Sequence, residues 1–91
     1  MKEEIFEKSI RNFVLERFPL ARQRSVSNQE SLLENGILDS LGILEVVTFL
    51  EGEFLITVDD DELQPENFAS IASMSAYVGH KRTAGSVNKQ G

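Results

Sequence analysis

The chain has 91 residues, no cysteine and a formal net charge of −6, with 41% hydrophobic and 26% charged residues. These values are typical of one soluble globular domain, because so short a chain rarely forms two cores. The excess of acid argues against binding to nucleic acid and favours partners with basic surfaces. The lack of cysteine excludes disulfides and thiolate metal sites. The charged start and the absence of a long apolar run predict a cytoplasmic protein without membrane insertion.

The first predicted helix covers about residues 2–18. Apolar residues recur in it at helical spacing and define a core-facing side, formed by Ile5, Phe6, Ile10, Phe13, Val14 and Phe18. Arg17 lies in the last turn, where a cation suits the helix dipole. Pro19 is expected to end this helix.

A long connection is predicted from Leu20 to Leu38. So long a loop should contain some local structure. Ser27 and Glu30 have the spacing of a capping box, which favours a single helical turn held to the core by Leu32 and Leu33. Asn35-Gly36 is expected to end that turn.

The second long helix is predicted to begin at Asp39 or Ser40 and to end near Leu55. Asp39-Ser40 has the residue types of a helix start. The buried stripe is predicted to contain Ile43, Val46, Val47, Leu50 and Phe54. Leu41, Glu45, Thr48 and Gly52 fall on the opposite side. An exposed Leu41 is either an ordinary surface leucine or a contact for a partner, and both interpretations stay open.

The remaining chain predicts one short helix and one long helix. Residues 59–62 are interpreted as a solvated acidic connection, since the glycine and distant glutamate of a calcium loop are missing. Pro65 is expected to start a short helix with Phe68 turned inward. Ser70 is predicted to cap a last helix that Gly79 closes. Its core side is predicted to contain Ile71, Met74, Tyr77 and Val78, and the basic residues His80, Lys81 and Arg82 follow its end.

These elements predict an all-α fold, a helical bundle with three long helices, a short helix before the last one, and a long first loop. The predicted domain covers residues 1–82. The small polar residues 83–91 are expected to form a disordered tail.

The chain is not expected to be an enzyme. A serine hydrolase needs a base near its nucleophile, and the single histidine, His80, lies at a predicted helix end. No glycine-rich phosphate loop and no set of metal ligands is recognisable, so neither catalytic nor metal-binding residues are assigned. Ser40 can instead be the substrate of another enzyme. At a helix start, backbone N–H groups and the helix dipole stabilise a phosphate ester.

Two segments carry a specific resemblance. Residues 36–41, with Glu45 and the segment 51–54, resemble the second helix of acyl and peptidyl carrier proteins. Residues 65–71, followed by Tyr77-Val78, resemble the third and fourth helices of the same family at the same spacing. The resemblance covers about residues 5–78 and implies a four-helix bundle of the carrier-protein type, with residues 1–82 as the carrier domain.

The resemblance also implies a chemistry. Ser40 would carry a 4′-phosphopantetheine, attached by a phosphopantetheinyl transferase from coenzyme A with magnesium. Asp39 would help to position that transfer or serve only as the helix cap. The arm's thiol would hold an acyl or aminoacyl group as a thioester. The residues that would meet partner enzymes are Leu41, Ile43, Leu44, Glu45 and Thr48.

One departure from the family pattern bears on the pathway. Carriers of fatty-acid synthesis commonly have an acidic residue directly after Asp-Ser-Leu, whereas this chain has Gly42. With a glycine at this position, the chain resembles stand-alone carriers that acyl- or aminoacyl-adenylating ligases load in specialised pathways. The resemblance further implies a monomer that passes its cargo to downstream acyl-transfer enzymes. The alternatives are a carrier of fatty-acid synthesis and an unmodified acidic helical interaction module.

Overall fold

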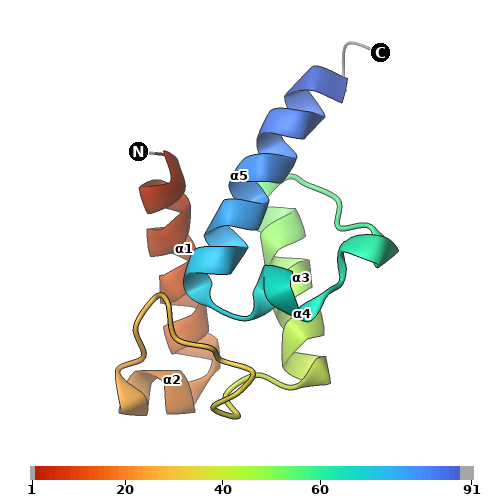
Figure 1. The fold of residues 1–91 in the computed structure, drawn as a ribbon. Helices are drawn as coiled ribbons and strands as arrows, with labels where there is room; N and C mark the ends of the chain where they lie inside the picture. Colours follow the sequence, from red (N-terminus) through yellow and green to blue (C-terminus); the bar gives the residue numbers. More distant parts are fainter. Residues whose placement is uncertain (1, 89–91) are drawn as a thin grey trace.

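The computed structural model describes residues 2–88, which form a bundle of α-helices (Figure 1). The elements in chain order are α1 (Lys2–Arg17), α2 (Pro19–Arg24), α3 (Ser40–Phe54), the 3₁₀ helix η1 (Asp60–Glu62), α4 (Pro65–Phe68) and α5 (Ile71–Asn88). No strand forms within these residues. The predicted all-α fold is thus confirmed, with three long helices, a short α4 before the last and a long connection before α3.

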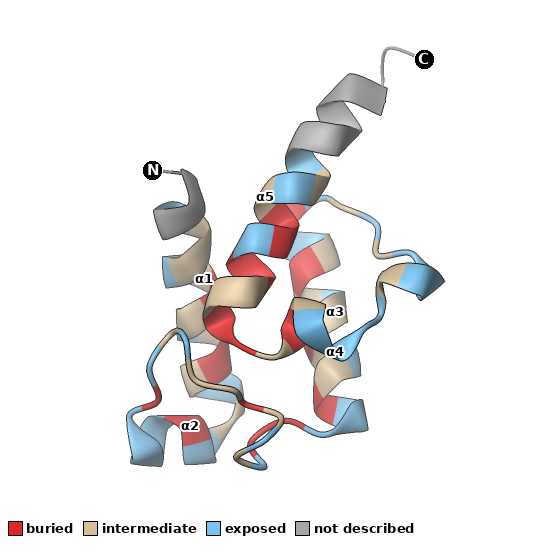
Figure 2. Cartoon of the chain, viewed as in Figure 1, coloured by how far each residue is buried: buried red, intermediate tan, exposed pale blue. Residues whose placement is uncertain are grey.

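The core lies between α1, α3 and α5 and is closed by α4 (Figure 2). Its fully buried side chains include Ile10, Val14, Val46, Leu50, Phe68, Ile71, Met74 and Val78. The periodic stripes of the sequence therefore predict the core well. Ile5 is an exception, because it is exposed although the first-helix stripe includes it.

Helix α2 is an element that the apolar pattern did not predict. Pro19 ends α1 as expected, but it also occupies the first position of α2. Proline fits there because its fixed φ suits a helix and no N–H is needed in the first turn. The helix ends at Arg24, and the left-handed φ of 51° at the C-cap Ser25 turns the chain so that the N–H of Val26 donates to the carbonyl of Ala21 at 3.3 Å.

The connection over residues 25–39 is tied to its surroundings by hydrogen bonds. Arg11 of α1 donates to the carbonyl of Val26 at 2.7 Å, and the N–H of Leu32 donates to the carbonyl of Ala69 at 2.7 Å. The predicted single helical turn is closed by the N–H of Asn35, which donates to the carbonyl of Ser31 at 3.2 Å. Gly36 follows with a φ of 81°, which suits a glycine at the end of a turn.

Helix α5 begins as predicted and ends later than predicted. The Ser70 hydroxyl accepts from the N–H of Ser73 at 3.0 Å, as a helix cap does. The helix continues through Gly79 to Asn88, so the end predicted at Gly79 is wrong. Residues 83–88 belong to this helix, and residues 89–91 of the predicted tail lie outside the described residues. The boundary between domain and tail stays a prediction.

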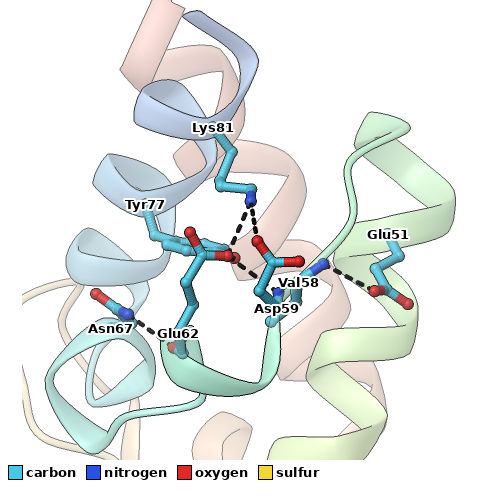
Figure 3. A network of polar contacts seen from close by, with 7 residues as sticks. All are labelled: Glu51, Val58, Asp59, Glu62, Asn67, Tyr77 and Lys81. Atoms are coloured by element: carbon cyan, nitrogen blue, oxygen red, sulfur yellow. Dashed lines mark hydrogen bonds and ion pairs between the residues drawn. The ribbon is translucent and has the colours of Figure 1, made fainter. Parts of the chain in front are cut away.

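A polar network holds the acidic connection against α5 (Figure 3). The carboxylate oxygen Oε1 of Glu62 accepts from the Tyr77 hydroxyl at 2.9 Å, from Nζ of Lys81 at 2.8 Å and from the N–H of Asp59 at 3.0 Å. Asp59, Asp60 and Asp61 are exposed, as predicted for a solvated connection. Glu62 is instead half-buried, so the interpretation of the whole run as solvated is wrong at this residue.

Candidate functional site

Ser40 is the first residue of α3 and is exposed. The start of α3 lies at the end of the bundle opposite the start of α1 and the end of α5 (Figure 1). The preceding Asp39 caps the helix, because its Oδ1 accepts from the N–H of Gly42 at 2.8 Å. The start of α3 is therefore fixed by a side-chain cap, and the Ser40 side chain is accessible beside the positive end of the helix dipole.

Gly42 is buried under the first turn of α3. A Cβ at this position would lie 3.0 Å from Cδ2 of Leu38 and 3.3 Å from Cε1 of Phe18. Position 42 thus faces the connection and the end of α1 rather than solvent. The sequence pattern indicated the glycine without indicating that a Cβ at position 42 would crowd Leu38 and Phe18.

The five residues predicted to meet partners do not all lie on one exposed face. Leu41 is 70% exposed, Leu44 is 53% exposed, and Thr48 is exposed. Ile43 is half-buried and packs against the core, so it lies at the edge of the face. Glu45 is partly exposed and paired with a residue of another helix.

The partner of Glu45 is Arg17, in the last turn of α1. The Nε of Arg17 donates to Oε1 of Glu45, and the hydrogen bond and charge of Glu45 raise the pKa of Arg17. The sequence analysis assigned Arg17 only to the helix dipole. No local pattern signals a contact between residues 28 positions apart.

A shallow groove of about 370 Å³ lies beside this ion pair. It is lined by Phe13, Arg17, Glu45, Thr48 and Phe49. The rings of Phe13 and Phe49 are stacked with their centroids 4.1 Å apart. An aromatic surface with a polar rim therefore lies beside the outer face of α3.

Other chemistry has little support in the described part of the chain. No group of three or more His, Asp or Glu side chains among the described residues is placed to hold a metal ion. None of the helices searched is both long and apolar enough to span a membrane. His80 lies exposed within α5 instead of after its end.

Comparison with known proteins gives two similar sequences, while no protein-family profile matches the chain. A protein named probable acyl carrier protein PigG, from a Serratia species, is 31% identical over 74 residues. The match covers 81% of this chain and 85% of that protein. An acyl carrier protein from Buchnera aphidicola is 34% identical over 68 residues, which cover 75% of this chain and 83% of the relative.

An all-helical bundle with an exposed serine at the start of α3 is the form expected of a carrier protein, and the similarity extends over most of both relatives. The chain belongs to the acyl carrier protein family. Membership confirms the resemblance found in the sequence and implies a phosphopantetheine prosthetic group. Proteins of this family act as carriers of acyl groups rather than as catalysts.

Proposed function

We propose that Ser40 is the attachment point of 4′-phosphopantetheine in this carrier. The observation that carries the proposal is the exposed Ser40 at the first position of α3, directly after the capping Asp39. Asp39 holds the first turn by its bond to the N–H of Gly42, which keeps Ser40 at the surface. A transferase can then reach the hydroxyl without any rearrangement of the helix.

The surroundings of Ser40 are suited to a covalently attached 4′-phosphopantetheine. A phosphodiester at a helix N-terminus is favoured by backbone N–H groups and by the dipole. The exposed Leu41 and Leu44 offer apolar contacts to the enzymes that approach the arm. When bound, the group supplies a thiol that holds an acyl or aminoacyl cargo as a thioester.

We further propose that a specialised pathway uses this carrier, as a monomer in the cytoplasm. An adenylating ligase would load it, and downstream acyl-transfer enzymes would receive the cargo. Gly42 supports this subfamily, since the acidic residue common there in carriers of fatty-acid synthesis would meet Leu38 and Phe18. A side chain at position 42 would require the buried Leu38 and the half-buried Phe18 to shift.

The first test is modification of the protein in cells. Co-expression with a phosphopantetheinyl transferase should add the mass of one 4′-phosphopantetheine, measured by intact-protein mass spectrometry. Ser40→Ala should abolish the addition. Ser27→Ala, which changes another exposed serine outside α3, should leave it unchanged. An unmodified wild-type protein would instead favour the helical interaction module.

The second test separates the two kinds of carrier. The modified protein is incubated with adenylating ligases for amino acids and other acids, and with the malonyl transferase of fatty-acid synthesis. Thioester formation by a ligase is the expected result. Loading by the malonyl transferase alone would assign the chain to fatty-acid synthesis.

A further inference from the structure

The outer face of α3 next to Ser40 carries little free charge. We call Leu41, Leu44, Glu45 and Thr48 the α3 face, because their spacing places them on one side of the helix. Glu45 is the one charged residue between positions 40 and 48. The two leucines of this face are both more than half exposed.

Arg17 neutralises the single acid of the α3 face. Its guanidinium is bonded to Glu45, and the two side chains are 58% and 41% exposed. An exposed pair of this kind contributes little to the stability of the fold. Its effect on an approaching protein is larger, because the pair presents almost no net charge where a lone carboxylate would attract a basic surface.

The apolar surface continues from the α3 face into the groove. Thr48 and Glu45 line this groove together with the stacked rings of Phe13 and Phe49. The Thr48 hydroxyl is occupied by a bond to the carbonyl of Leu44 at 3.0 Å. The leucines and the groove can therefore receive apolar side chains of a partner while Arg17 covers the carboxylate.

The other acids of α3 lie away from this surface. Glu51 accepts from the N–H of Val58 at 2.9 Å (Figure 3), and Glu53 accepts from the Ser9 hydroxyl at 3.3 Å. The exposed residues Asp59, Asp60 and Asp61 follow the far end of the helix. Beside Ser40 itself the acid is the exposed Asp39, whose carboxylate caps the helix by accepting from the N–H of Gly42.

We propose that the α3 face docks partner enzymes through apolar contact and that Arg17 is a specificity-determining residue. This inference rests on the proposed function at Ser40. Arg17 withholds Glu45 from partners with a basic docking surface and repels their cations. The partner that fits is a carrier-modifying or carrier-loading enzyme with an apolar docking surface, one of whose side chains enters the groove over Phe13 and Phe49.

The test measures transfer of phosphopantetheine to the apo protein by two transferases, one with a basic docking surface and one with an apolar surface. kcat/KM is measured at about 20 mM and about 300 mM salt, since screening of exposed charges differs strongly between them. For the wild type with the apolar transferase, kcat/KM should change little with salt. Arg17→Gln should raise kcat/KM for the basic transferase roughly threefold or more at low salt, and high salt should remove the gain.

Three variants serve as controls. Lys8→Gln removes another exposed cation of α1 and should have no such effect. The double variant Arg17→Glu/Glu45→Arg keeps an ion pair with the two charges exchanged. Its kcat/KM with the basic transferase should equal that of the wild type. Leu44→Gln should lower kcat/KM for the apolar transferase at both salt concentrations. Circular dichroism melting curves check that each variant is folded.

Several results would overturn the inference. If Ser40 is modified with equal kinetics in the wild type and in Arg17→Gln, the inference about Arg17 is wrong while the proposed function at Ser40 stands. A double variant with the kinetics of Arg17→Gln would have the same meaning. A dimer dissolved by Leu44→Gln, detected by light scattering, would assign the face to a second copy. Unchanged transfer rates with altered thioester hydrolysis would assign the groove to the cargo. Failure of both transferases to modify Ser40 would remove the proposed function, and this inference with it.

Discussion

One oxygen of Glu62 accepts hydrogen bonds from three donors, and the titration of the residue reflects this. The bond from Lys81 is the main cause that lowers the pKa of Glu62, with smaller contributions from Asp59 and Tyr77. The hydrogen bond to Glu62 also raises the pKa of Lys81. The pKa of Tyr77 is raised first by the burial of its hydroxyl and then by its hydrogen bond to Glu62. The ionised carboxylate and the cation are therefore the forms favoured by the folded protein.

The pH dependence of stability follows from the sign of these shifts. Because the folded-state pKa of Glu62 is lowered, its stabilising effect is present above the ordinary carboxyl pKa of about 4.3 and is lost as the pH falls through the folded value. Glu62→Gln should lower the free energy of unfolding by about 1 kcal/mol near pH 7 and by less near pH 3. Urea unfolding at the two pH values measures the difference.

The control for this prediction is Glu34→Gln, the same change at an exposed residue of the long connection. It should leave the free energy of unfolding nearly unchanged. An equal loss of stability for Glu62→Gln at both pH values would mean that the charge of Glu62 is unimportant.

Among the elements, α3 shows how local signals and packing combine. Its start at Ser40 and its end at Phe54 follow the prediction closely, since the Asp39 cap and the apolar stripe are both local signals. Its two glycines differ in surroundings. Gly42 is crowded by Leu38 and Phe18, whereas an added Cβ at Gly52 would meet nothing within 4 Å.

We therefore expect opposite results from alanine at the two glycines of α3. Gly52→Ala should stabilise the protein by about 0.5–1 kcal/mol, because alanine loses less backbone entropy in a helix. Gly42→Ala should destabilise it by about 1 kcal/mol, since the crowding at the buried Leu38 outweighs that gain. Thermal and urea unfolding of both variants test this. A Gly42→Ala protein as stable as Gly52→Ala would show that the site can expand.

The differences between sequence and structure have physical causes. Helix α2 has six residues, too few for an apolar period to be visible. Gly79 was taken as a helix end, but a glycine costs only about 1 kcal/mol inside a helix. Tyr77 and Lys81 on either side of it are held by Glu62, so α5 continues. The Arg17–Glu45 pair is missed because it depends on how α1 packs beside α3.

In the whole molecule, α5 is joined to the rest of the bundle along its first three turns. Tyr77 and Val78 are buried in the core. Lys81 bonds to Glu62, and Arg82 donates to the carbonyl of Phe54 at 2.6 Å. These contacts hold the part of α5 up to Arg82 against the bundle, and a domain that ends near Arg82 stays a prediction.

Truncation tests this boundary. A chain that ends at Arg82 should unfold cooperatively, with a melting temperature within a few degrees of the full chain, because the named contacts are kept. A chain that ends at Ala76 loses Tyr77 and Val78 and should not unfold cooperatively. Differential scanning calorimetry distinguishes the two. A large loss of stability in the chain that ends at Arg82 would assign residues 83–91 to the domain.

The position of Ser40 has a practical consequence. The start of α1 and the end of α5 both lie at the far end of the bundle from the start of α3 (Figure 1). An affinity handle or a fluorescent protein joined beside the start of α1 or the end of α5 would leave Ser40, the proposed attachment point, accessible. The same geometry would let the protein be immobilised on a sensor surface beside one of these helix ends, with the proposed attachment point directed toward the solution.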